Sequence, residues 1–224
     1  CFDEPGFKVP FDLTLTVPAD HVALANTPEV ASTPVEGGRK RVRFERSAPL
    51  PTYLFSFAVG PFDVVTGPTL PANAWRNNAL PIRGIALHGK GTKLSEQLAQ
   101  VGPIVAALEA WFASPYPYAK LDVVGLPSYP GAMENAALIL FDEYLLMVDR
   151  TRTPLDEQRD ATGTLAHELS HQWFGNLVTM AWWDDLWLNE AFATWIANRM
   201  LAAVRPELGG ETRRLDEWRR ALAT

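Results

Sequence analysis

The sequence predicts an α+β fold in which short strands come first and longer helices follow. Over the first 67 or so residues apolar and polar residues alternate, as they do in half-buried strands. Residues 68–80 are rich in proline, asparagine and alanine and interrupt this pattern. Beyond them apolar residues recur every three or four positions, as on amphipathic helices. This order favours a β unit followed by a mixed α+β unit.

The predicted strands of the first unit follow one another with short turns between them. Residues 8–17 alternate strictly, and shorter alternations follow in "RKRVRFERS" at 39–47 and "TYLFSFAVGPFDVV" at 52–65. Proline and glycine between these segments indicate turns. The sequence therefore predicts a β domain over residues 1–67, a linker over 68–80, and a second domain over 81–224.

The second unit combines helices with two strands. An apolar stripe from Leu94 to Phe112 predicts an amphipathic helix, and "LDVVGL" and "ALILF" predict strands. Three further helical patterns are expected, at about 156–176, 186–203 and 210–222.

Composition excludes some classes of protein and leaves the compartment open. The net charge is −6 and the basic residues form no long stripe, so no nucleic-acid partner is expected. No apolar run approaches the roughly 20 residues of a transmembrane helix. Cys1 is the only cysteine, which argues against a disulfide-stapled secreted module and leans toward the cytoplasm. The chain opens on cysteine and not methionine, so a periplasmic or secreted location stays open.

The stretch "HELSHQWFGN" at 167–176 carries a metal-binding pattern. Residues four apart lie about 40° apart around a helix, so His167 and His171 share one face and can bind one Zn²⁺. Glu168 projects to one side, within reach of a zinc-bound water, where it can act as general base. The alternative is two core histidines on an apolar helix face.

A third potential ligand favours the metal site over the alternative of two core histidines. Eighteen residues separate His171 from Glu190, which lies in "WLNEAFATW" at the start of another helical pattern. The apolar flank of that helix is expected to bury Glu190, and a buried carboxylate needs a cation. Two histidines and a glutamate form a recurrent catalytic zinc set. Thr194, one turn further on, is either a partner of a ligand or an ordinary buried threonine. Most tryptophans around this segment are expected to pack in the core; they are Trp173, Trp182, Trp183, Trp187 and Trp195.

With these residues in place, the segment 167–195 resembles the zinc site of the M1 family of metallo-aminopeptidases. "GAMEN" at 131–135 matches a second hallmark of that family, and "CFDEP" at the N-terminus resembles the region where its N-terminal domain runs on toward the catalytic domain. The resemblance implies the end of an N-terminal β-sheet domain followed by the first part of a thermolysin-like catalytic domain. It also implies one Zn²⁺, held by His167, His171 and Glu190, with Glu168 as the catalytic base.

The same resemblance assigns the substrate-binding segment. Glu134 would bind the free α-ammonium group of a peptide N-terminus, because a carboxylate can test for that cation by a charge-assisted hydrogen bond. Gly131 and Ala132 are small enough for a substrate strand to lie against their backbone. Met133 and Asn135 complete the segment. The expected partner is therefore a peptide, bound by its N-terminus.

Some family features are missing from this sequence. Ala191 stands where the family usually has glycine, a mild change. The family's oxyanion-stabilising tyrosine lies well downstream of the second glutamate, whereas all five tyrosines here precede the zinc helix. The chain is therefore expected to be an internal fragment with little activity, since one lost oxyanion donor costs about 10² to 10³ in rate. A zinc endopeptidase and a non-catalytic M1-like scaffold stay as alternatives.

Overall fold

The computed structural model describes residues 3–209 and residue 219. Ten strands precede or alternate with four α-helices in these residues. The strands are β1 Thr14–Pro18, β2 Val22–Ala25, β3 Glu29–Val35, β4 Arg39–Phe44, β5 Phe57–Gly60, β6 Phe62–Thr66, β7 Ile82–Leu87, β8 Leu121–Leu126, β9 Ala132–Met133 and β10 Leu138–Asp142. The helices are α1 Ser95–Phe112, α2 Glu143–Leu146, α3 Leu155–His171 and α4 Leu186–Val204. Within the described residues, no helix combines the length and apolar character that a bilayer crossing requires.

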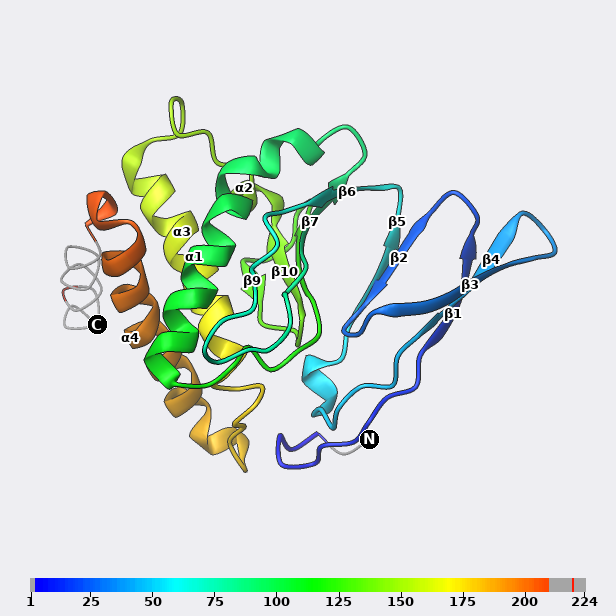
Figure 1. Ribbon diagram of the computed structural model, residues 1–224, viewed down its shortest axis with the longest axis horizontal. Coiled ribbons are helices and arrows are strands. Elements are labelled where there is room, and N and C mark those ends of the chain that lie inside the picture. Colours follow the sequence, from blue (N-terminus) through cyan, green and yellow to red (C-terminus); the bar gives the residue numbers. More distant parts are fainter. Residues whose placement is uncertain (1–2, 210–218, 220–224) are drawn as a thin grey trace.

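A five-stranded sheet forms the centre of the molecule, in the order β6-β7-β8-β10-β9. Strands β7, β8 and β10 are parallel, whereas β6 and β9 run antiparallel at the two edges. Helices α1, α3 and α4 cover one face of this sheet (Figure 1). The largest apolar core lies between these helices and the sheet. It is built from residues such as Leu108, Phe141 and Leu165, all fully buried. The helix stripe expected from Leu94 onward therefore faces this core.

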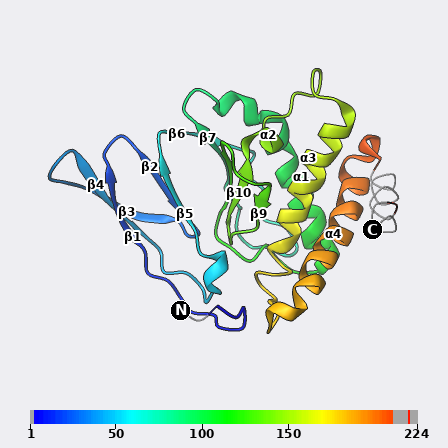
Figure 2. The same cartoon turned by 180° about the vertical axis from the view of Figure 1, so that it is seen from behind.

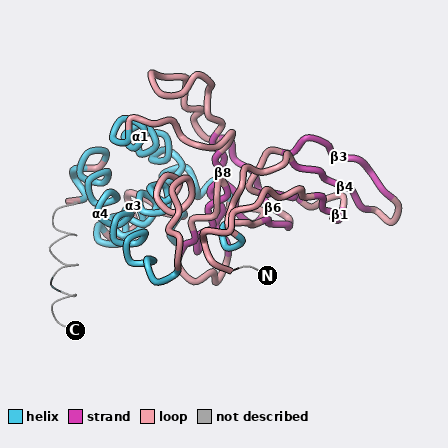
Figure 3. Tube along the Cα trace, turned by 90° about the horizontal axis from the view of Figure 1, so that it is seen from below, coloured by secondary structure: helices cyan, strands magenta, loops and turns pink. Residues whose placement is uncertain are grey.

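The opposite face of the central sheet is covered by the β2–β5 ribbon (Figure 2). Strand β2 is buried on both sides because its side chains alternate between two cores. Leu24 packs with Ile85 and Val124 of the central sheet. Ala23 and Ala25 point the other way, toward the three-stranded sheet β1-β4-β3, whose strands lie farthest from the helices (Figure 3). The α+β class predicted from the sequence is confirmed.

Two elements differ clearly from their predicted bounds, and a third prediction falls outside the described residues. The first strand begins at Thr14, not at Lys8; before it, Val9 makes only an isolated bridge to Leu50, and Pro10 has no N–H to donate. Helix α3 ends at His171, not at 176, because the chain turns toward Gly175, whose φ of +114° suits glycine. The helix predicted at 210–222 lies outside the described residues, apart from residue 219.

Strand pairing crosses the predicted domain boundary. Strand β6 lies within residues 1–67, but it pairs antiparallel with β7 of the second unit. The central sheet therefore begins before the predicted linker. The division into domains at 68–80 stays a proposal, and the pairing of β6 favours a boundary between β5 and β6.

Candidate metal and substrate site

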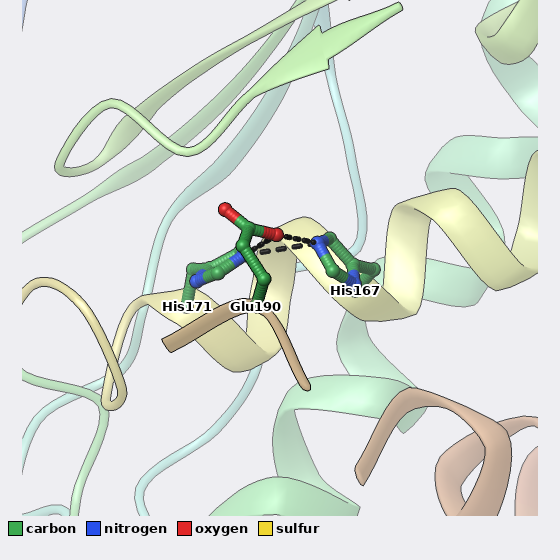
Figure 4. A group of neighbouring side chains, drawn as sticks. All are labelled: His167, His171 and Glu190. Carbon is green, nitrogen blue, oxygen red and sulfur yellow. Dashed lines mark hydrogen bonds and ion pairs between the residues drawn. The ribbon is translucent and has the colours of Figure 1, made fainter. Parts of the chain in front are cut away.

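Three side chains from two helices converge beside the central sheet. His167 and His171 lie one turn apart near the end of α3, and Glu190 lies in the second turn of α4 (Figure 4). The Nε2 atoms of the two histidines are 2.9 Å apart. Glu190 Oε2 lies 3.2 Å from His167 Nε2 and 3.6 Å from His171 Nε2. These are the only three potential ligand atoms of this kind that cluster among the described residues.

Packing between α3 and α4 brings Glu190 to the histidines. Leu169 of α3 and Ile196 of α4 are fully buried in the shared core. Beside the ligands, the rings of Phe174 and Phe192 stack with centroids 4.1 Å apart. The sequence separation between the ligands is thus bridged by apolar contacts, not by the ligands themselves.

The other nitrogen of each histidine is also engaged. His171 Nδ1 donates to the carbonyl oxygen of Phe174 at 2.9 Å. His167 Nδ1 lies 3.3 Å from Thr194 Oγ1, so Thr194 lies where a partner of a ligand would lie. Because a carbonyl only accepts, the proton of neutral His171 is on Nδ1, and its Nε2 carries a lone pair. Contacts of this kind orient a metal-binding imidazole.

The donor set fits Zn²⁺. Two imidazole lone pairs and a carboxylate oxygen pointing at one another repel unless a cation lies among them. Ligand atoms about 2.1 Å from a tetrahedral Zn²⁺ lie roughly 3.4 Å from one another. The three distances of 2.9, 3.2 and 3.6 Å are close to that spacing. Three protein ligands also leave one position for water, as in catalytic zinc sites.

Burial and neighbouring charges shift the pKa values of His171 and Glu190 in this cluster. Burial by itself lowers the pKa of His171, but its hydrogen bond to Glu190 and the neighbouring carboxylates outweigh burial and raise this pKa to about 9. Hydrogen bonds from His167 and His171 hold the pKa of Glu190 well below its usual range. His171 and Glu190 therefore stabilise each other's charged form.

Glu168 lies beside the ligands but does not join them. Its side chain is buried, and its Oε2 atom has no hydrogen-bond partner among the described residues. Burial raises the pKa of Glu168 to about 8, with Glu134 and Glu190 adding to the shift and His171 opposing it. A buried carboxyl group with a free oxygen and a pKa near neutrality suits proton transfer.

The "GAMEN" segment borders this cluster along the edge of the central sheet. Strand β9 contains Ala132 and Met133 and pairs only with β10, so its other edge is unpaired within the described sheet. Gly131 has a φ of +75°, which a residue with a Cβ atom rarely adopts. Glu134 is 7% exposed, and its charge contributes to the pKa shifts of Glu168 and His171. Asn135 Nδ2 donates to the carbonyl oxygen of Tyr53 at 3.2 Å.

Two expectations about burial around the site are wrong. The side chain of Glu190 is 47% exposed instead of buried, because Glu190 lies on the outer side of the cluster. Of the five tryptophans, Trp173 is buried, whereas Trp182, Trp187 and Trp195 are exposed. The first turn of α4 therefore presents a largely apolar surface within the described part of the chain.

Two amides that no sequence pattern indicated connect the end of α3 to the "GAMEN" segment. Gln172 and Asn176 are both buried, and each donates a hydrogen bond to the carbonyl oxygen of Glu134. Their positions one and five residues after His171 are a weak signal in the sequence, because Gln and Asn are usually exposed.

Fold and site together define a mixed α+β protein in which two histidines and one glutamate form a cluster that could hold a metal ion. Residues 96–224 match the Peptidase family M1 domain, and residues 1–54 match the Peptidase M1 N-terminal domain. The chain belongs to peptidase family M1, a family of zinc-dependent aminopeptidases.

Curated relatives align with almost the entire chain. Aminopeptidase M1-B of Oryza sativa subsp. japonica is 41% identical over 218 residues, which is 97% of this chain and 24% of that protein. Aminopeptidase M1 of Arabidopsis thaliana is 38% identical over 97% of this chain and 24% of its own length. Endoplasmic reticulum aminopeptidase 2 of Homo sapiens is 36% identical over 93% of this chain and 21% of its own length. The chain thus spans about a quarter of the length of these relatives.

Proposed function

We propose that this chain carries the metal and substrate site of a zinc aminopeptidase that removes N-terminal residues from peptides. The observation that supports this best is the convergence of His167 Nε2, His171 Nε2 and Glu190 Oε2, with the buried carboxyl group of Glu168 beside them. When bound there, Zn²⁺ supplies an acidified water and polarises the scissile carbonyl group.

Each protein group has a distinct role in this proposal. Glu168 takes the proton from the attacking water and passes it to the leaving amine, because its oxygen is buried, unpartnered and not needed as a ligand. Phe174 and Thr194 hold the two imidazole rings in the ligand orientation. The core between α3 and α4 fixes both helices, so the ligands require little reorganisation.

Recognition of the N-terminus is assigned to the "GAMEN" segment. A peptide added along the free edge of β9 would place its α-ammonium group at one end of the strand, where Glu134 follows. A carboxylate that is 7% exposed attracts a cation more strongly than one in bulk water. Gly131, at the other end, leaves open space where a side chain would stand.

The test combines metal and substrate measurements. Purified chain is stripped of metal, titrated with Zn²⁺ and assayed with an amino-acid anilide and with its N-acetyl form. We expect one Zn²⁺ per chain and turnover of the free-amine substrate alone. No zinc uptake would contradict the proposal.

Two alternatives predict different results in the same assay. An endopeptidase would tolerate N-acetylation, whereas the buried position of Glu134 favours a group that tests for a free amine. A non-catalytic scaffold would bind zinc without turnover under any condition, and it gives no reason for the buried, unpartnered Glu168 Oε2.

Low activity of this chain is part of the proposal. All five tyrosines of the sequence precede the zinc helix, and the hydroxyl group of Tyr53 already donates to the carbonyl oxygen of Gly175. We therefore expect turnover about 10² to 10³ below that of a relative with a tyrosine at the oxyanion. Turnover equal to that of such a relative would show that this donor is not needed.

A further inference from the structure

Gln172 joins the zinc helix to the segment that carries Glu134. The side chain is fully buried directly after the ligand His171. Its Nε2 atom donates to the carbonyl oxygens of Glu134 at 3.1 Å and Glu168 at 3.3 Å. Its Oε1 atom accepts from the backbone N–H of Ala137 at 3.0 Å. One amide thus contacts both ends of the segment 134–137 and the backbone of the catalytic base.

The segment held by Gln172 has an unfavourable backbone conformation. Ala137 is fully buried with a φ of +58°, a left-handed conformation that is unfavourable for a residue with a Cβ atom. Such a conformation persists only where its surroundings fix it. Gln172 fixes the N–H of Ala137, and from the opposite side Lys120 Nζ donates to its carbonyl oxygen at 2.8 Å.

We propose that Gln172 is a positioning residue for the aminopeptidase reaction. It holds the backbone of Glu134 at a fixed distance from helix α3, which carries the two histidines. The α-ammonium group of a substrate can then contact Glu134 while the scissile carbonyl group of the same substrate lies at the metal. Displacements of about 1 Å in such an arrangement cost roughly 10²-fold in rate. This inference rests on the proposed function, because it assumes that Glu134 binds the amine and that the histidines bind Zn²⁺.

No other uncharged side chain of this size has the required hydrogen-bonding groups. Methionine fills a similar volume but leaves two carbonyl groups and one N–H buried without this partner. Glutamate keeps the acceptor for Ala137 but places negative charge against the carbonyl oxygen of Glu134. Both substitutions loosen the same link and leave the three proposed zinc ligands unchanged.

The test measures amine recognition at equilibrium, without turnover. The probes are a phosphinic dipeptide with a free α-amine and its N-acetyl form, titrated calorimetrically into the zinc-loaded chain. We expect wild type to prefer the free amine about 100-fold. In Gln172→Met the ratio should fall about tenfold, while zinc affinity changes less than about twofold. Gln172→Glu should give the same fall, which keeps the test valid if one variant does not fold.

Gln158→Met is the matched control. Gln158 is also buried on α3, roughly 20 Å from Gln172, and its Nε2 atom holds the carbonyl oxygens of Arg150 and Thr153. This variant should keep the wild-type ratio. An unchanged ratio in both Gln172 variants, an equal fall in Gln158→Met, or a parallel loss of zinc affinity would overturn the inference. A wild type without amine preference would instead contradict the proposed function, and the inference would fall with it.

Discussion

Glu190 contributes the only carboxylate oxygen of the cluster with His167 and His171, yet its side chain is about half exposed. The two histidines lie deeper, and His171 is almost completely buried. The side of the cluster that is most open to solvent is therefore that of Glu190, near the start of α4. In the proposed function, the carboxylate of Glu190 offsets part of the charge of a divalent cation, and the buried carboxyl group of Glu168 is left for proton transfer.

Replacement of Glu190 by glutamine should weaken zinc binding. The variant keeps the size of the side chain but exchanges a carboxylate ligand for an amide, so we expect affinity to fall by about 100-fold or more. Competition with a chromophoric chelator measures this fall. Glu207→Gln, which removes an exposed carboxylate paired with Arg205, should leave the affinity unchanged. Equal affinities for all three proteins would exclude Glu190 as a ligand.

Replacement of Glu168 by glutamine should separate metal binding from chemistry. The amide cannot accept the proton of the attacking water, so we expect turnover to fall by about 10² to 10⁴. Zinc content should stay at the wild-type level, because Glu168 is not among the three clustered ligands. Loss of zinc together with activity would contradict the role of a base.

At the level of secondary structure, the turn between β9 and β10 contains both Glu134, the proposed amine-binding residue, and Ala137, whose backbone conformation is strained. The turn through Ala137 connects the edge strand of the "GAMEN" segment to the buried strand β10, and it uses a left-handed conformation at a residue that is not glycine. Lys120 and Gln172 hold this turn from two sides. The position of Glu134 is therefore set by side chains that lie on other elements.

Glycine at position 137 should stabilise the protein. It adopts a φ of +58° without the clash of a Cβ atom, so we expect the free energy of unfolding to rise by about 0.5 to 1 kcal/mol. Urea unfolding measures this change. Ala136→Gly is the control: this neighbour is equally buried but is not among the residues with positive φ, and its substitution should destabilise the protein. An equal loss of stability in Ala137→Gly and Ala136→Gly would mean that Ala137 is not strained, because both changes remove one buried methyl group.

At the scale of the whole molecule, a buried cation connects the N-terminal strands with the central sheet. Lys120 Nζ donates to the carbonyl oxygen of Ala25 on β2 and to Asp122 Oδ2 on β8, at 2.6 and 2.8 Å. Arg83 Nη2 donates to the same Asp122 oxygen from β7. Burial lowers the pKa of Lys120 to about 8, while Asp122 opposes the shift.

This lowered pKa predicts that stability rises in mild alkali. Below pH 8 both the folded and the unfolded protein carry the proton on Lys120, and the folded state bears the cost of a buried charge. Between pH 8 and about 10.4 the unfolded chain binds more protons, so the free energy of unfolding should rise, by on the order of 2 kcal/mol. Urea unfolding of wild type and Lys120→Met between pH 7.5 and 10 tests this, since the variant lacks the titrating group. Parallel curves would mean that Lys120 stays charged throughout.

Local features were predictable because their causes are local. The helix period places His167 and His171 on one face whatever the rest of the chain does, and their rings do lie one turn apart with centroids at 4.5 Å. The apolar stripe of α1 follows from the same periodicity, and the short apolar runs of β8 and β10 are typical of buried strands. Resemblance to the M1 family, carried by "HELSH", Glu190 and "GAMEN", supplied the proposed roles that no periodicity could give.

Other features of the fold and the site could not be predicted from local sequence. The pairing of β6 with β7, the exposure of Glu190 and the amide of Gln172 between two segments all depend on contacts across the chain. A sequence determines which residues can bind a metal or a carbonyl group, because that is a property of each side chain. Only the tertiary structure decides which of them meet, because the packing of α3, α4 and the central sheet fixes distances between residues far apart in the chain.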